Sequence, residues 1–208
     1  MFRPLIGSGG PAGPLLSHGR VRLRPPLSRD YRAWARLREQ SRAFLEPWEP
    51  TWGPDALSRS AYRWRLRHYE RDQREGWGYS LFLLRASDQE LLGGISIGNL
   101  RRGVAQCCSL GYWIGEPYAR QGYMSEGLFA VLDFIFGPLG LHRAEAACLP
   151  RNTASRRLLE KLGFREEGLA RGYLRIAGRW QDHVLYAQLA EEFQARRREL
   201  EDAVKRGR

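Results

Sequence analysis

A change in hydrophobic period near residue 122 constrains the fold of this chain more than any other feature. Upstream of it, three apolar segments separated by turns have the length and composition of strands, at residues 78–86, 91–100 and 105–114. From 122 to about 136 the apolar residues recur at helical spacing, and 142–149 then reads as a strand again. A helix between two strands in this order indicates a β-α-β crossover, which joins parallel strands. The sequence therefore predicts antiparallel hairpins that lead into one parallel pair.

The remaining segments complete the order β-α-α-β-β-β-α-β-α-β-β and a mixed α+β fold with a mostly antiparallel sheet. They are a strand over 20–24, helices over about 29–40, 56–75 and 152–162, and strands near 173–177 and 183–189. Ser28 is a suitable N-cap for the first helix, and Gly163 closes the last one. Three regions are expected: a loose lead-in (1–17), one domain (18–190) and a charged C-terminal helix or tail (191–208).

Composition excludes several classes of protein. A hydrophobic content of 43% and a mean hydropathy of −0.52 indicate a globular chain whose 208 residues suffice for one core. The longest apolar runs, such as 128–136, are too short to span a bilayer, so no membrane association is expected. Cys107, Cys108 and Cys148 are odd in number and form no CxxC pair. We therefore expect a reducing, cytoplasmic location and no metal site.

The net charge favours an anionic partner. The formal charge is +11, from 34 basic and 23 acidic residues. Such a balance suits a phosphate-bearing cofactor, an acidic protein or a nucleic acid. The aromatic residues Trp48, Trp52, Trp64 and Trp77 are interpreted as core and loop packing in preference to a platform for stacking bases.

The turn that precedes the helix at 122 has the features of an anion site. A strand ends near Ile114, Gly115 and Pro117 turn the chain, and the helix begins after Gly122. A helix N-terminus presents unpaired N–H groups and partial positive charge, and a glycine there permits close backbone approach to a pyrophosphate. An ordinary strand-to-helix turn capped by Ser125 is the alternative reading of this segment alone.

Two motifs together resemble the GNAT superfamily of N-acetyltransferases, which use acetyl-CoA. The second motif of that superfamily, N-x-x-[AS]-x-x-x-Y-x-x-x-G-F, is matched by Asn152, Ser155, Gly163 and Phe164. The first, [QR]-x-x-G-x-[GA], falls on positions 119–124, where only Gly122 is retained. The resemblance implies an acyltransferase whose central sheet opens at the acetyl-CoA site between the parallel strands, with helices on both faces.

Further segments resemble the RimJ/RimL branch of this superfamily, and RimJ most of all. They span roughly 20–190 and include "FLEPWEP", "LGYWIG", "QGYM" and "YLRIAGRWQDHVLY". That branch acetylates the N-terminal amine of ribosomal proteins. The resemblance implies transfer of acetyl from acetyl-CoA to the α-amine of an Ala- or Ser-starting protein, with a small-subunit ribosomal protein as the expected acceptor.

The same resemblance assigns the cofactor-binding residues. The backbone of Tyr112, Trp113 and Ile114 is implied to bind the pantetheine arm and to polarise the acetyl carbonyl. The N–H groups of a second segment are implied to bind the pyrophosphate, and its residues are Ala119, Arg120, Gln121, Gly122, Tyr123 and Met124. Asn152 is expected to hold the cofactor arm, and Ser155 is also expected to bind the cofactor, beside its sulfur.

The catalytic acid departs from the common pattern. Many members of the superfamily protonate the thiolate with a Tyr, but that position is Leu159 here and has no proton to donate. Ser155 lies one helical turn earlier on the same face, and RimL-like enzymes use a Ser at this place. We therefore expect Ser155 to be the proton donor. The alternative is that Ser155 only caps or packs.

The catalytic base is less well defined by the sequence. RimL-like enzymes use a Glu at the position that is Gly172 here, so this role does not transfer. Glu46, Glu49 and Glu145 are the substitutes, and Glu46 and Glu49 flank Trp48 in a loop expected to reach the acceptor. Because an α-amine has a pKa near 8, a weak base or a water chain is also compatible with the reaction.

Two alternative functions remain open at this stage. The same fold can acetylate a small amine such as an antibiotic, a polyamine or a free amino acid. The charge of +11 also supports an RNA- or ribosome-associated binding protein with weak catalysis.

Overall fold

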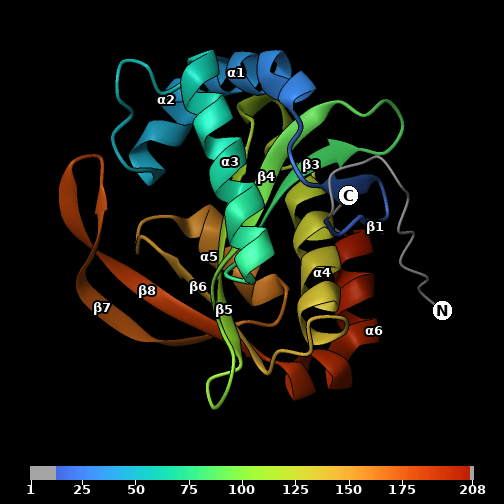
Figure 1. Cartoon of the computed structure of the whole chain (residues 1–208). Helices are drawn as coiled ribbons and strands as arrows, with labels where there is room; N and C mark the ends of the chain where they lie inside the picture. Colours follow the sequence, from blue (N-terminus) through green and yellow to red (C-terminus); the bar gives the residue numbers. More distant parts are fainter. Residues whose placement is uncertain (1–12, 207–208) are drawn as a thin grey trace.

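Eight strands form one sheet at the centre of the computed structural model, which describes residues 13–206 (Figure 1). Their order across the sheet is β1-β2-β3-β4-β5-β6-β8-β7. The pair β5–β6 is parallel, and every other neighbouring pair is antiparallel. The predicted α+β class, with antiparallel hairpins leading into one parallel pair, is confirmed.

The strands follow the predicted hydrophobic segments closely in the middle of the chain. They are β1 Leu16–His18, β2 Val21–Arg24, β3 Tyr79–Arg85, β4 Leu91–Arg101, β5 Cys107–Ile114, β6 Arg143–Cys148, β7 Arg165–Ile176 and β8 Arg179–Leu189. The helices are α1 Tyr31–Gln40, α2 Arg42–Leu45, α3 Arg59–Glu75, α4 Tyr123–Phe136, α5 Thr153–Lys161 and α6 Ala190–Arg206. Short 3₁₀ turns lie at Ser28–Asp30, Glu46–Trp48 and Glu116–Tyr118.

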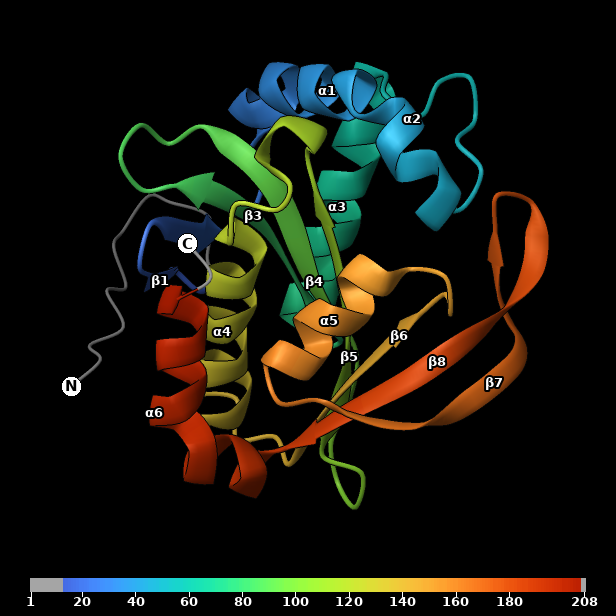
Figure 2. The ribbon, with the colours of Figure 1, turned by 180° about the vertical axis from the view of Figure 1, so that it is seen from behind.

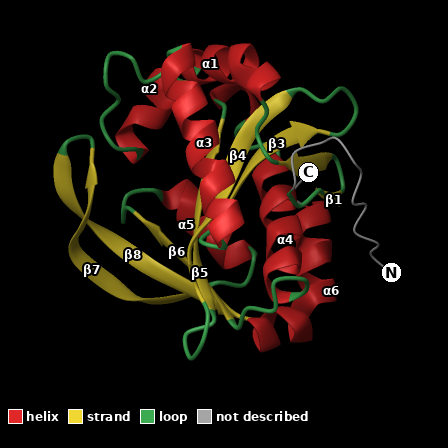
Figure 3. Cartoon of the chain, viewed as in Figure 1, coloured by secondary structure: helices red, strands yellow, loops and turns green. Residues whose placement is uncertain are grey.

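Helices cover both faces of the sheet (Figures 1–3). On one face α1 and α3 pack their apolar sides, including Trp34 and Tyr62, against β3 and β4. On the other face, seen in Figure 2, α4, α5 and α6 enclose the larger core. Figure 3 shows the resulting helix–sheet–helix layers. The middle of the sheet is therefore covered on both sides, whereas the edge strand β7 is mostly exposed.

The central helix α4 carries apolar residues around nearly its whole circumference. Leu128, Val131, Leu132 and Ile135 have no exposed surface, which is the pattern of a fully buried helix. Its first turn follows β5 directly, through the 3₁₀ turn at Glu116–Tyr118. Burial of α4 therefore fixes the position of its N-terminus at the end of β5.

The parallel strands β5 and β6 pair along only part of their lengths. Their register runs from Cys107 with Arg143 to Leu110 with Ala146 and ends there. β5 continues to Ile114, and over this stretch it pairs only with β4. The edge of β5 that faces β6 is consequently open beyond Leu110, as expected from the resemblance to acetyl-CoA-binding folds.

The structure also corrects several expected boundaries. The strand expected near 173–177 begins eight residues earlier, at Arg165, because β7 is an edge strand whose side chains are mostly exposed and do not alternate. Ser28 does not cap the first helix, because it lies in the 3₁₀ turn and α1 begins at Tyr31, with Asp30 in the N-cap position. The helix expected from 56 begins at Arg59, with Ser58 as its N-cap.

The two chain ends differ from simple tails. The lead-in expected over 1–17 lies mostly outside the described residues, but Leu16 and Ser17 belong to β1. The charged C-terminal segment forms α6, which buries Phe193, Leu200 and Val204 in the main core. Among residues 13–206, none of the helices combines the length and the apolar character needed to cross a membrane.

Candidate active site

A cavity of about 760 Å³ occupies the opening between β5 and β6. The end of β5, the first turn of α4 and the N-terminal half of α5 form most of its wall, and the segment 44–49 closes one side. Its lining includes ten of the eleven predicted cofactor-binding residues: Tyr112, Trp113, Ile114, Ala119, Arg120, Gly122, Tyr123, Met124, Asn152 and Ser155.

The start of α4 has the conformation expected of an anion site. Arg120 and Gly122 both have left-handed backbones, with φ of 61° and 83°. No side chain caps this helix, and within residues 13–206 the N–H groups of residues 120–125 have no hydrogen-bond acceptor. Successive N–H groups turned in this way form an anion-binding concavity at the positive end of the helix dipole. Ser125 therefore does not cap the helix, which was the alternative reading.

The charges that line the cavity suit a polyanion. Arg120, Arg151, Arg157 and Lys161 are cationic, and none of them has an ion pair with a carboxylate of residues 13–206. Glu49 is the single acidic residue in the lining, and it is paired with Arg38. Open N–H groups and unpaired cations are the donor set that the phosphates of acetyl-CoA require. The residues present therefore fit that cofactor.

Sequence reasoning missed the cations of α5. Arg157 and Lys161 are four residues apart, so they lie on one face of the helix that Asn152 caps. This spacing next to the second motif could have identified them as cofactor-binding residues. Gln121, whose main-chain N–H is among the open ones, is the predicted cofactor-binding residue that does not line the cavity. Its side-chain amide donates to the Pro117 carbonyl at 2.7 Å, and its own carbonyl accepts from Arg20 at 2.8 Å.

Asn152 and Ser155 have different local roles at the start of α5. The Asn152 side-chain oxygen accepts a hydrogen bond from the Ser155 N–H at 3.1 Å, so Asn152 is the N-cap of this helix. The Ser155 hydroxyl does not cap the helix, and it lies 2.7 Å from the Tyr112 hydroxyl of β5. Leu159, which replaces the common Tyr, has no exposed surface and packs in the core.

The pair Tyr112–Ser155 bridges the gap between β5 and α5. Burial raises the pKa of the Tyr112 phenol above its ordinary value, so the phenol keeps its proton across the physiological range. Tyr112 therefore has a hydrogen to donate to the Ser155 oxygen. Either hydroxyl can be the donor in this pair, and when Tyr112 donates, Ser155 has its own hydroxyl hydrogen available for another acceptor.

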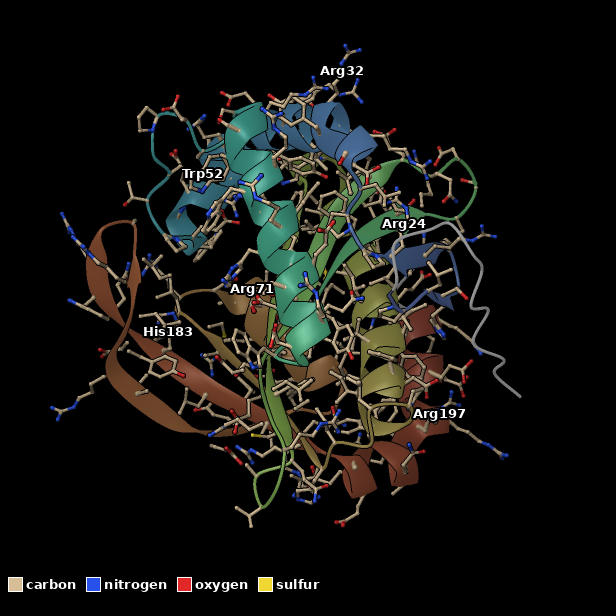
Figure 4. All side chains as sticks on the ribbon, in the orientation of Figure 1. Arg24, Arg32, Trp52, Arg71, His183 and Arg197 are labelled. Atoms are coloured by element: carbon tan, nitrogen blue, oxygen red, sulfur yellow. The ribbon has the colours of Figure 1, made fainter. Side chains whose placement is uncertain are left out.

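A second cavity of about 420 Å³ lies on the side of α3 and reaches the same point of the sheet. Aromatic side chains form part of its wall, and Trp34, Trp52, Tyr69 and Phe82 are among them. Trp52 lies on the loop between α2 and α3 (Figure 4). The two cavities share three lining residues, which are Glu49, Tyr112 and Trp113.

Glu49 lies at the junction of the two cavities, and strong contacts hold it there. Its carboxylate accepts from the Arg38 guanidinium at 2.8 and 2.5 Å and from the Trp52 indole N–H at 2.9 Å. Arg38 lies against the rings of Trp52 and Trp113, with centroid distances of 4.2 and 4.9 Å. A bidentate pair stacked on aromatic rings fixes the carboxylate in one position.

The other two candidate bases lie elsewhere. Glu46 is half exposed, lies 3.5 Å from Arg42 and lines neither cavity. Glu145 is on β6 opposite Ser109, in the paired part of the strands, and contacts Arg101 and Arg143. The geometry therefore favours Glu49 among the three carboxylates proposed from the sequence.

Fold and site together define an acyltransferase that draws its acyl group from a CoA thioester. The family described as Acetyltransferase (GNAT) domain matches residues 20–165, and the chain belongs to this family. The resemblance stated from the two sequence motifs is thereby confirmed, as is the use of acetyl-CoA.

Comparison with individual proteins places the chain near the RimJ/RimL enzymes. It is 35% identical over 163 residues to the [ribosomal protein uS5]-alanine N-acetyltransferase of Escherichia coli, covering 77% of this chain and 84% of that one. It is 35% identical over 153 residues to the probable N-acetyltransferase YjcK of Bacillus subtilis, with coverage of 74% and 84%. Mycobacterium smegmatis RimJ, solved with CoA-disulfide, has a TM-score of 0.78 and 34% identity over 89% of this chain and 94% of its own. The protein is thus an acetyl-CoA-dependent N-acetyltransferase related to the RimJ/RimL ribosomal-protein enzymes.

Replacing Gly122 by Ala is expected to raise KM for acetyl-CoA about tenfold, or about 1.4 kcal/mol of binding free energy. The left-handed backbone at this position disfavours any side chain, so the first N–H groups of α4 shift out of line. Steady-state kinetics at varied acetyl-CoA concentration measure the change.

Gly140→Ala is the matched control for this substitution. Gly140 also has a positive φ, of 62°, but lies in the loop after α4, where an added methyl group meets no atom within 4 Å. Both variants carry similar backbone strain, and only Gly122→Ala is expected to change KM. Equal KM values in the two variants would show that the start of α4 is not the anion site.

Proposed function

We propose that this enzyme acetylates the N-terminal α-amine of a protein, with Ala or Ser as the first residue. The observation that carries this proposal is the absence of a strong base at the junction of the cavities. Within residues 13–206, no His or Asp lines either cavity, and Glu49, the single Glu, is engaged by Arg38 and Trp52. An α-amine has a pKa near 8 and is partly neutral at cellular pH, whereas a lysine or polyamine nitrogen is almost fully protonated. Such a junction suits the α-amine.

The two cavities give the substrates separate routes to one point. The larger cavity takes acetyl-CoA, which supplies the acetyl thioester, and the smaller one receives the acceptor from the side of α3. The amine nitrogen then meets the acetyl carbonyl beside Tyr112 and Trp113. Direct transfer between bound substrates requires no covalent enzyme intermediate. Main-chain groups at the open end of β5 are positioned to polarise the carbonyl.

Ser155 donates the proton that the leaving thiolate requires. As the acetyl–sulfur bond breaks, the Ser155 hydroxyl supplies a hydrogen to sulfur, and Tyr112 stabilises the Ser155 oxygen with its own hydrogen bond. Tyr112 acts through Ser155 and is a positioning residue. The amine loses its proton to water, and a proton from the solvent restores the Ser155 hydroxyl.

Glu49 anchors the incoming amine. Because Arg38 and Trp52 hold its carboxylate, it presents a fixed negative charge toward both cavities. A fixed carboxylate attracts the ammonium form of the acceptor and orients it before proton loss. Glu46, which lines neither cavity, has no such part.

A ribosomal protein of the small subunit is the proposed acceptor. Support comes from the related E. coli enzyme, which is named for the alanine of ribosomal protein uS5. The relation covers most of both chains, but YjcK matches as strongly and is named only as a probable N-acetyltransferase. The identity of the acceptor must therefore be tested directly.

Mass spectrometry of ribosomal-protein N-termini, from cells with and without this chain, tests the acceptor. We expect at least one Ala- or Ser-starting terminus to lose its acetyl group when the chain is absent. In vitro, peptides that begin with Ala or Ser should be acetylated at the α-amine, and a peptide with a blocked α-amine and free lysines should not. Acetylation of polyamines or antibiotics with unchanged ribosomal termini would assign the enzyme to small amines.

Ser155→Ala is expected to lower kcat by about a hundredfold or more, with little change in KM for acetyl-CoA, because a general acid acts only in the transition state. Tyr112→Phe should lower kcat less, and the double variant should be no slower than Ser155→Ala alone. Ser109→Ala, on the distant part of β5, is the control. Full kcat in Ser155→Ala would leave Ser155 with a packing role only.

Glu49→Gln is expected to raise KM for an acceptor peptide about tenfold, because the amide keeps the shape of the side chain but loses the charge that attracts the ammonium group. KM for acetyl-CoA should change little. Glu46→Gln removes the same charge three residues away and serves as the control. An effect of Glu46→Gln as large as that of Glu49→Gln would place the anchoring role outside the junction.

A further inference from the structure

The outer face of α3 carries exposed tryptophan among arginines. Trp64 is 60% exposed and Trp77, just after the helix, is 55% exposed. The expectation of core and loop packing for these two residues does not agree with rings this exposed. The opposite side of α3 is apolar, since Tyr62 and Leu66 are buried against the sheet. The outer face is therefore not required for folding, and exposed indole rings on it call for another explanation.

The arginines of this face are largely unpaired. Arg59, Arg63, Arg67 and Arg74 have no carboxylate within ion-pair distance among residues 13–206. Arg71 is the exception, because it lies 3.7 Å from Asp72 and also contacts His68. The exposed acids on the helix are Glu70 and Glu75. Six arginines against three acids leave α3 with an excess of positive charge.

Trp64 is held in an orientation suited to stacking. Its ring is parallel to that of His68, with an interplanar angle of 7° and a centroid distance of 5.4 Å. Arg63 precedes it, Arg67 follows three residues later, and both are exposed. On the same side, Arg71 lies 5.9 Å from the Trp77 ring, and Figure 4 shows Arg71 on α3, in front of the sheet. Two indole rings therefore lie among the arginines of this face.

The same helix borders the proposed acceptor cavity. Arg65 and Tyr69, on the neighbouring side of α3, line that cavity. A ligand on the outer face would thus lie beside the point where an acceptor N-terminus enters. This proximity rests on the proposed function, whereas binding to the outer face does not.

We propose that the outer face of α3, formed by Arg59, Arg63, Trp64, Arg67, Arg71, Arg74 and Trp77, binds RNA. The unpaired guanidinium groups contact backbone phosphates, and the Trp64 ring stacks with an unpaired base. An acidic protein segment would use the charges but would gain little from indole rings interleaved with arginine. An acceptor that is itself bound to RNA would then be held by two contacts, its terminus in the cavity and its RNA on α3.

Fluorescence anisotropy of the full chain with a labelled oligouridylate of about 20 nucleotides tests the proposal. Reversing two charges with R63E/R67E is expected to weaken binding at least tenfold and to make the salt dependence less steep. The slope of log K against log salt should fall by about 1.4, because each lost phosphate contact on a single strand removes about 0.7. Trp64→Ala should weaken binding about tenfold and leave the slope unchanged, because stacking releases no counterions.

R22E/R198E is the matched control. Arg22 and Arg198 are exposed, unpaired with any carboxylate of residues 13–206 and distant from α3 in sequence, and their reversal changes the net charge by the same amount. We expect RNA affinity within about twofold of the unchanged chain. Acetylation of a short acceptor peptide, which carries no RNA, should be unaffected in every variant. Loss of peptide acetylation alone would therefore bear on the proposed function and not on RNA binding.

Three results would overturn the proposal. The first is equal weakening by R63E/R67E and R22E/R198E, which would mean that net charge alone attracts RNA. The second is an unchanged affinity of Trp64→Ala for the oligouridylate, which would show that no base stacks on the Trp64 ring. The third is tighter binding of a labelled polyglutamate than of the oligouridylate, with the same sensitivity to R63E/R67E, which would assign the face to an acidic protein.

Discussion

The separation of β5 from β6 beyond Leu110 is the constraint on which the site depends. Up to that residue the two strands share a parallel ladder, and beyond it β5 keeps only its antiparallel partner. Unpaired main-chain groups at a buried edge are unfavourable unless a partner satisfies them. In the opening, the Tyr112 side chain forms a hydrogen bond with Ser155 on α5. This side-chain bond connects the two sides where the main-chain bonds between the strands end. A cofactor arm with amide groups can supply the missing hydrogen bonds.

Sequence pattern predicted the buried strands closely and missed most of the two strands at the edges of the sheet. The segments around β3, β4, β5 and α4 have strong hydrophobic periods because core contacts fix them. β7 is exposed along most of its length, so its residues carry no alternation, and its first eight positions were missed. The three-residue strand β1 is too short to leave a pattern at all.

The site was predictable where backbone geometry is encoded by residue type. Gly122 marks the left-handed turn at α4, and Asn152 marks the start of α5. Contacts that depend on long-range packing were not predictable. The sequence gives no sign that Glu49 contacts Arg38. This contact nevertheless distinguishes Glu49 from Glu46, which is three residues earlier and lies near Arg42 instead. Nor does helical periodicity tell whether Trp64 faces the sheet or the solvent.

The Arg38–Glu49 pair explains how one carboxylate can serve an enzyme that lacks a strong base. An isolated carboxylate in an aromatic cavity would be costly to keep charged, and it would respond to each change in its surroundings. The guanidinium, stacked between Trp52 and Trp113, keeps that charge in place and gives it a fixed direction. Such a carboxylate is well suited to attract and orient an ammonium ion, and poorly suited to remove a proton from one. The pair thus favours an acceptor that loses its proton readily to water, which is the property of an α-amine.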